Sequence, residues 1–243
     1  MGVIEFGTKE IEYEVIRSDR KTLGINIDPD NGVIVRSPRN VSEGKIKEVV
    51  EDKSSWILKK LKKVAEIKPR PGPREFLSGE KLPYLGRRYR LKVKPVEKIK
   101  KVRVKLYQGK FDIDYPQELE AKEEERRKKI RGELISWYRE HATKKIKERV
   151  EKYKGQVGVE PNKVKVKKQK KRWGSCSSKG NLNINWRIIM APMSIVDYIV
   201  VHELVHLKHN NHSREFWQIV ETIIPDYEER QEWLRVNGRR LEV

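Results

Sequence analysis

The chain has 243 residues, enough to bury a sizeable core in one large domain or two small ones. Charged residues make up 38% of it, and no apolar run approaches the length that crosses a bilayer, which argues against a membrane-spanning protein. A single cysteine, Cys176, excludes an internal disulfide and fits a reducing compartment. Because the first residues also lack the pattern of a secretory signal, we expect a cytoplasmic protein.

The net charge of +20 is unevenly distributed along the chain. Residues 191–243 contain six basic and nine acidic side chains, so they carry −3 and the first 190 residues carry +23. A strongly basic surface attracts polyanions, which makes nucleic acid a candidate partner beside a peptide, protein or nucleotide substrate. Solubility and heat adaptation explain the same composition equally well.

Alternating apolar and polar residues predict mostly strands in the first half of the chain. The expected elements are, in order, a meander over residues 11–37, one helix over 42–67, a Pro-rich linker over 68–74, and hairpins over 80–94 and 101–114. Turn signals fall at Asn31-Gly32, Gly86-Arg87 and Gln108-Gly109. We therefore expect a β-rich N-terminal domain with one helix, covering residues 1–115.

Helical periodicity dominates the second half of the chain. The expected elements are a long charged helix over 117–154, strands near 163–168 and 181–186, and helices over 194–209, 214–223 and 227–237. Strands that come first and helices that come last predict an α+β fold. We expect residues 116–243 to form a second domain, with a small sheet and an active-site helix.

The sequence His-Glu-x-x-His predicts a metal site in this second domain. His202 and His206 are four residues apart, so on a helix their side chains share one face, about one 5.4 Å pitch apart. Zinc accepts two such imidazoles readily, and Glu203 can take a proton from a water on the metal. An apolar stretch before the motif and a capping box of Ser194 and Asp197 predict a buried helix. This weakens the alternative interpretation, two hydrogen-bonded surface histidines beside a solvated glutamate.

A third ligand is expected within the next few residues. On a continuing helix His209 would lie about 10 Å from His202, which fits one tetrahedral ion poorly. Asn210-Asn211 is a typical helix stop, after which the chain can fold His212 back over the first two histidines. The pattern favours His212, with His209 and the acid Glu215 as alternatives. The expected cofactor is one Zn²⁺ per chain, or another divalent metal.

The segment from Arg172 to Trp217 resembles the signature of the YgjP-like metallopeptidase family, within the zincin group and distantly related to SprT-like zinc proteases. The likeness extends to YEVIRSDRKTLGINI near the N-terminus, to WILKKL and to PDYEERQEWL. It implies a zincin-like catalytic domain over residues 116–243. The family's ligand and catalytic positions correspond, without a departure, to the metal ligands His202, His206 and His212 and to the catalytic Glu203.

The resemblance also implies a place for the substrate, because related zincins pair an extended substrate with an edge strand beside the metal. The candidate substrate-binding residues are Arg172, Trp173, Gly174 and Ser175. An ordinary hairpin that packs Trp173 and Trp186 into the core is an equally good interpretation. The preceding basic run, Lys163–Arg172, predicts either a phosphate or nucleic-acid patch or a solvated strand face.

The expected function is a zinc-dependent hydrolase, and the favoured form is a metallopeptidase in which Glu203 activates a metal-bound water. Tyr198 and residues 172–175 are candidates for stabilising the oxyanion. One alternative is a metal-dependent nucleoside triphosphate pyrophosphatase, although no Walker-type loop and no magnesium-binding carboxylate cluster are present. Others are a nucleic-acid-associated protease, and a nucleic-acid module whose zinc is structural. Structural zinc sites are usually closed by cysteines, which argues against the last.

Overall fold

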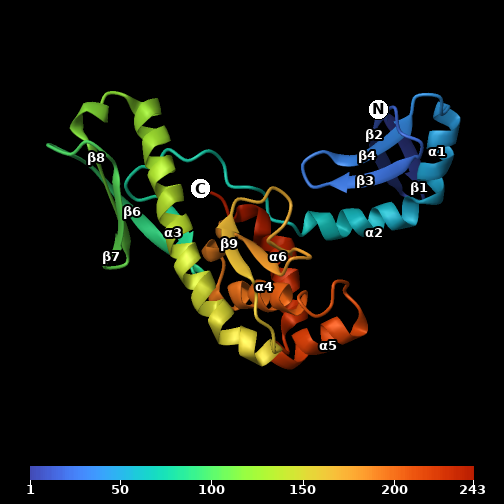
Figure 1. The fold of residues 1–243 in the computed structure, drawn as a ribbon. Coiled ribbons are helices and arrows are strands. Elements are labelled where there is room, and N and C mark those ends of the chain that lie inside the picture. Colours follow the sequence, from blue (N-terminus) through green and yellow to red (C-terminus); the bar gives the residue numbers. More distant parts are fainter. The chain divides into compact units, whose positions relative to one another are not determined.

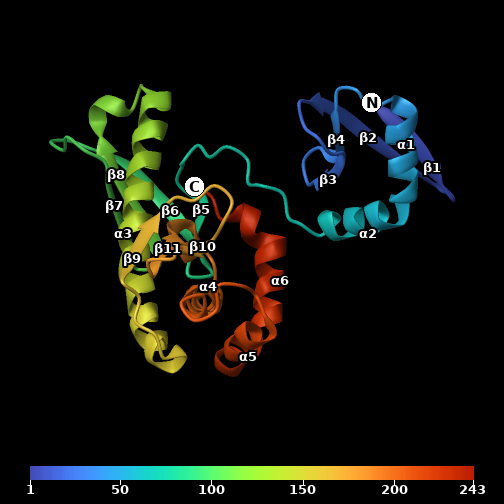
Figure 2. The ribbon, with the colours of Figure 1, turned by 45° about the vertical axis from the view of Figure 1, so that its right-hand side comes forward.

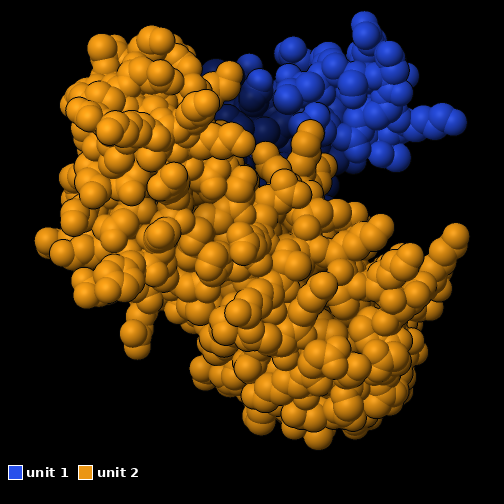
Figure 3. All heavy atoms as spheres, turned by 60° about the vertical axis from the view of Figure 1, so that its left-hand side comes forward, with its two compact units in different colours: residues 1–70 blue, residues 71–243 orange.

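The computed structural model describes residues 1–243 and divides into two compact units, Met1–Arg70 and Pro71–Val243 (Figures 1 and 3). The division lies inside the expected linker, but it differs from the domain boundary expected near residue 115, since residues 71–115 belong to the second unit. Three small sheets and six α-helices make up the two units, so the predicted α+β class is confirmed.

The first unit consists of one sheet and two helices. Its elements are β1 (Gly2–Phe6), β2 (Lys9–Ser18), β3 (Gly24–Asp28), β4 (Gly32–Pro38), α1 (Glu43–Asp52) and α2 (Ser54–Ala65). The strand order is β1-β2-β4-β3, with β2 and β4 parallel, so the predicted meander is wrong. Val33, Ile34 and Val35 of β4 are all buried, and a strand that is apolar on both faces belongs inside a sheet. The single expected helix is two, because α1 ends and α2 begins at Lys53.

The second unit begins with a sheet of the same topology. Its strands are β5 (Lys81–Tyr84), β6 (Arg87–Val96), β7 (Arg103–Tyr107) and β8 (Lys110–Pro116), in the order β5-β6-β8-β7 with β6 and β8 parallel. Both predicted hairpins form. Their turns are Leu85-Gly86, one residue earlier than expected, and Gln108-Gly109. All four turn residues have a positive φ, as two-residue hairpin turns of type I′ require.

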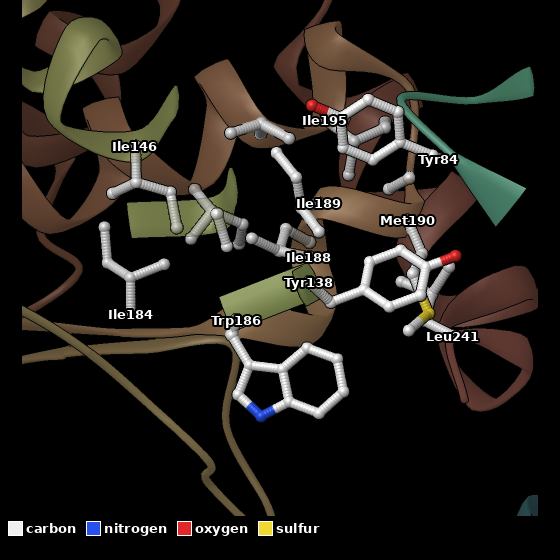
Figure 4. Packing of buried hydrophobic residues seen from close by; sticks show 14 of the residues in the cluster. Tyr84, Tyr138, Ile146, Ile184, Trp186, Ile188, Ile189, Met190, Ile195 and Leu241 are labelled. Atoms are coloured by element: carbon white, nitrogen blue, oxygen red, sulfur yellow. The ribbon is translucent and has the colours of Figure 1, made fainter. Parts of the chain in front are cut away.

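The long helix α3 (Glu123–Val157) covers one face of this sheet, after a short 3-10 turn at Gln117–Leu119 (Figures 1 and 2). Trp137 and Phe111 pack edge to face with ring centroids 4.9 Å apart. The hydroxyl of Tyr138 donates to the carbonyl of Pro83 at 2.7 Å, and its ring contacts Trp186 in the core (Figure 4). These contacts explain why the sheet belongs to the second unit and not to the first 70 residues.

The rest of the second unit builds the site region. Its elements are β9 (Lys163–Lys167), β10 (Gly174–Cys176), β11 (Asn181–Asn185), a 3-10 helix (Trp186–Met190), α4 (Met193–Val205), α5 (Arg214–Ile223), α6 (Tyr227–Asn237) and a final 3-10 turn (Gly238–Arg240). The sheet order is β10-β11-β9, so β10 and β9 are its two edges. Ten of the thirteen residues of α4 are buried, which makes α4 a core helix. No helix of the chain is both long enough and apolar enough to span a membrane.

The start of α4 differs from the predicted capping box. The helix begins at Met193 without a side-chain cap. Asp197 instead accepts hydrogen bonds from Arg149 Nη2 at 2.8 Å and from the Tyr153 hydroxyl at 3.1 Å, both on α3. A buried carboxylate needs a charged or hydrogen-bonding partner. The Arg149 guanidinium forms charge-assisted hydrogen bonds, which are stronger than those that the backbone N–H groups of a helix terminus offer. This ion pair ties α4 to α3.

We predict that Gly86→Ala destabilises the second unit more than the matched change Gly109→Ala. Both glycines have positive φ (80° and 73°), so alanine is strained by about 1 kcal/mol at either position. A Cβ at Gly86 would also lie 2.9 Å from the Pro192 Cα, whereas the space beside Gly109 is open. We expect a further loss of about 1–3 kcal/mol for Gly86→Ala in urea unfolding. Equal losses for the two variants would show that this contact does not matter.

Candidate metal centre

Three histidines converge at the end of α4. His202 lies in its last turn, His206 at its C-cap, and His212 in the loop before α5. One ring nitrogen from each lies within 4.8 Å of the others, and the Nε2 atoms of His202 and His212 are 3.1 Å apart. Ligand atoms about 2.0–2.1 Å from a tetrahedral zinc are about 3.3–3.4 Å from one another. The His202–His212 pair is therefore close to the separation of two ligands on one ion, and the three histidines together could hold a metal ion.

The loop after α4 sets this geometry. The helix ends at Val205, four residues earlier than expected, and the backbone N–H of His209 donates to the Val205 carbonyl. The Nδ1–H of His206 donates to the His209 carbonyl at 3.0 Å, which leaves the Nε2 of His206 available to a metal. The structure thus brings His212 to the first two histidines. His209 and Glu215 are not part of the cluster.

Two aromatic side chains, Phe216 and Trp217, pack against the three histidines, and the sequence alone did not identify this role. The buried ring of Phe216 lies 4.6–5.0 Å, between centroids, from the rings of all three histidines. Trp217 stacks on His212 at 5.5 Å. Both residues belong to the first turn of α5, and they fix the ring orientations by packing. In the sequence Phe216 and Trp217 are only two adjacent aromatic residues near the start of a helix, a pattern that any residues of a hydrophobic core could show.

Glu203 is the one buried carboxylate beside the triad. It is 4% exposed, and its Oε2 has no hydrogen-bond partner. Burial raises the pKa of Glu203 to about 8, although the nearby charge of Arg172 opposes the shift. Burial, together with the charges of the other two histidines, lowers the pKa of His202 to about 3. Burial therefore favours an uncharged His202 and leaves the Glu203 carboxyl unsatisfied. A divalent cation is the group that such a set of donors fits.

Gly174 on β10 lies directly against Glu203. A Cβ at this position would lie 2.5 Å from Glu203 Cγ and 2.6 Å from Cδ, so no side chain larger than hydrogen fits unless the glutamate moves. Of the four residues expected to bind substrate, Gly174 is thus the one whose identity the site dictates. Its strand pairs with β11 on one side only, so the other edge of β10 carries unpaired backbone groups.

These residues line a cleft of about 750 Å³. Its walls are the triad and Glu203, residues 172–176, Tyr198 and Ile199 of α4, Asn210, and Gln231, Leu234 and Arg235 of α6. Burial, reinforced by the charges of Tyr227 and Glu203, raises the pKa of Tyr198 to about 12, so its hydroxyl keeps its proton. The contribution of α6 was not predicted, because nothing in its sequence marks which side faces a cleft.

The structure distinguishes between the interpretations that the sequence left open for residues 172–176 and for Trp186. All four residues from Arg172 to Ser175 line the cleft, yet Trp173 also packs close to Gly238, so it belongs to cleft and core alike. Trp186 is buried in the core. Burial and the charge of Glu203 raise the pKa of Cys176, which favours the thiol over a nucleophilic thiolate.

The basic run Lys163–Arg172 is a strand with an exposed face over β9, and its last residue, Arg172, lines the cleft. Lys163, Lys165 and Lys167 of β9 are exposed, while Val164 and Val166 between them pack against the core. β9 is the sheet edge opposite β10, so these lysines do not line the cleft.

We predict that the full chain binds one divalent metal ion, and that His212→Ala weakens this binding by more than about 100-fold. His212 is exposed, so its removal should leave the melting temperature of the apoprotein unchanged. His209→Ala is the matched control, and it should bind metal like the unchanged chain. Calorimetric titration with Zn²⁺ measures both. Equal affinities for the two variants would contradict the assignment of the third ligand.

The sequence and the fold were compared with those of known proteins. No curated protein matches the sequence. The metallopeptidase zymogen abylysin of Pyrococcus abyssi is 24% identical over 40% of this chain and 99% of its own, with a TM-score of 0.37. The zymogen jannalysin of Methanocaldococcus jannaschii is 23% identical over 39% of this chain and 95% of its own, with a TM-score of 0.34. The family model of the YgjP-like metallopeptidase domain matches residues 21–237, and the chain therefore belongs to the YgjP-like metallopeptidase family.

Proposed function

We propose that the protein is a zinc-dependent metallopeptidase in which Glu203 is the general base. The main support for this proposal is the environment of Glu203. Its carboxylate is buried, has one oxygen without a hydrogen-bond partner, and lines the cleft beside the three converging imidazoles. Structural metal sites do not need such a group, whereas a hydrolase needs a base within reach of the attacking water. Membership of the family supports peptide or protein substrates.

Zinc is the metal that this donor set suits best. The cluster offers three imidazoles and no thiolate, and three protein ligands leave a fourth position for water or substrate. A bound divalent ion would act as a Lewis acid and make water more acidic. His202, His206 and His212 would hold it, and burial, which lowers the pKa of His202 and of His206, favours the neutral imidazoles that a metal ion requires.

The protein's own groups divide the remaining work. Glu203 takes the proton of the attacking water and passes it to the leaving amine. Its raised pKa makes the protonated form accessible at neutral pH, which the second step requires. The Tyr198 hydroxyl lies in the same cleft and keeps its proton, so it can donate to the oxygen on which negative charge develops.

The free edge of β10 is our candidate for the substrate-binding strand. An extended peptide can add to an unpaired strand edge through main-chain hydrogen bonds, and Gly174–Cys176 border the cleft beside Glu203. Gly174 would then let substrate and base approach each other closely. Arg172, Trp173 and Ser175 would contact the flanking residues of the substrate.

A second candidate function is that of a nucleoside triphosphate pyrophosphatase, and one observation favours it. Arg172 and Arg235 both line the cleft, and arginine recognises phosphate groups through paired hydrogen bonds. Arg235 is already paired with Glu232, however, which reduces its availability. A hydrolysis screen that includes unfolded proteins, peptides and nucleoside triphosphates distinguishes the two functions by their products.

We predict that Glu203→Gln retains the metal and loses about 100- to 10,000-fold in turnover of an unfolded-protein substrate, because the base is removed while the ligands remain. Glu215→Gln, at an exposed position outside the cluster, is the matched control and should keep full turnover. Metal content and turnover are measured on the same samples. Unchanged turnover in Glu203→Gln would contradict the role of Glu203, and release of a nucleoside monophosphate without peptide cleavage would favour the second candidate.

We also predict that Gly174→Ala lowers turnover by up to about 100-fold with the metal retained. The new methyl group would displace the Glu203 side chain, and a shift of about 1 Å is enough for such a loss. Gly132→Ala on α3, where a Cβ meets open space, serves as the control. Full activity in Gly174→Ala would show that the position of Glu203 is not set by this contact.

A further inference from the structure

The sheet β5-β6-β8-β7 has one face that α3 does not cover. Strand alternation places Arg88, Arg90, Lys92 and Lys94 of β6 on this face, together with Arg103 and Lys105 of β7. All six side chains are exposed. We call this surface the basic sheet face. Neighbouring cations on one strand lie about 6.6–6.8 Å apart, so they form a ladder of positive charge.

Acidic residues compensate only one end of the basic sheet face: Asp112 of β8 lies between Lys92 and Lys105 in the register, and Asp114 lies between Lys94 and Arg103. The other end has no acidic residue in the register: Arg90 lies between Lys81 and Lys110, and Arg88 lies opposite Pro83. Like charges directly opposite one another destabilise a sheet. The one ion pair on this face joins Lys94 to Asp114 at 3.8 Å. The cations around Arg90 therefore remain available to an external polyanion.

General solubility does not explain the pattern, because the first sheet has the same topology and the opposite charge. Its outer face carries Glu5, Glu10, Glu12 and Glu14, against one basic residue, Arg36. The sequence shows the same contrast by segment. Residues 1–70 carry a net +3, residues 71–190 carry +20 and the remaining residues −3. Of the +20, residues 81–116, which hold the second sheet, carry +9, so positive charge is not spread evenly over the whole chain.

An exposed aromatic ring stands on the same face. Tyr107 lies at the end of β7, opposite Lys110. It is 61% exposed, more than the other exposed aromatic residues, Phe6 and Trp56. Cations that follow a backbone and an aromatic ring that stacks on a base are the two features that single-stranded nucleic acid requires. A lipid surface would need apolar side chains able to insert, and the basic sheet face offers none.

We propose that the basic sheet face binds single-stranded nucleic acid, through its cations to the phosphates and through Tyr107 to a base. This surface lies on strands that do not line the metal cleft. The proposal is therefore independent of the proposed peptidase activity, and each can fail without the other.

The test measures binding of a fluorescein-labelled 20-nucleotide oligothymidylate to the full chain by anisotropy. The variant Arg88→Glu/Arg90→Glu/Lys105→Glu removes three cations from the basic sheet face. The control Lys163→Glu/Lys165→Glu/Lys167→Glu makes the same change of charge on β9. We expect the dissociation constant to rise at least about 10-fold for the first variant and less than about 2-fold for the second, with thermal melts of both unchanged.

A second measurement separates stacking from charge. Tyr107→Ala should weaken binding about 5- to 100-fold without changing the dependence on salt, whereas removing one phosphate-binding cation should reduce the slope of log K against log salt by about 0.7. Equal losses for the two charge variants, or no binding at 50 mM salt, would overturn the proposal. Tighter binding to anionic vesicles, or a dimer that the first charge variant dissociates, would assign the face to a membrane or to the acidic sheet of a second copy.

Discussion

Burial of α4, in which ten of the thirteen residues are buried, determines the properties of the site. An apolar helix packed on α3, α5, α6 and β10 places Glu203 and His202 away from water. Desolvation then raises the pKa of the glutamate, lowers that of the histidine, and leaves the carboxyl without a partner. A group that is costly to bury and unsatisfied in the protein alone is the kind of feature that catalysis exploits.

The sequence predicted the parts of this site that local geometry decides. Helical spacing is enough to bring His202, Glu203 and His206 together, and Asn210-Asn211 marks where the chain must turn for His212. The neighbours that hold these groups could not be predicted in the same way. Gly174, Phe216 and the cleft-facing side of α6 reach the site through tertiary packing, which no spacing within one segment reports.

The fold shows the same limit. Class, hairpins and most helices follow from periodicity and turn residues, and they are as expected. The parallel pairs β2–β4 and β6–β8 join strands that are not consecutive, so the meander prediction is wrong. Asp197 has the sequence position of a capping residue, yet it binds Arg149, a half-buried arginine on α3, instead of the helix terminus. The domain boundary expected near residue 115 overlooked the aromatic contacts between the second sheet and α3. Two sheets of one topology with opposite surface charge also emerge only when the strands are paired.

Hydrolysis at this site requires that three imidazoles hold one ion and leave a position open beside Glu203. X-ray absorption at the zinc edge of the purified, zinc-loaded protein measures the number and type of these ligands. We expect three nitrogen ligands at about 2.0–2.1 Å together with one light, exchangeable oxygen ligand. A sulfur ligand from Cys176, or a fourth protein nitrogen that closes the site, would contradict it.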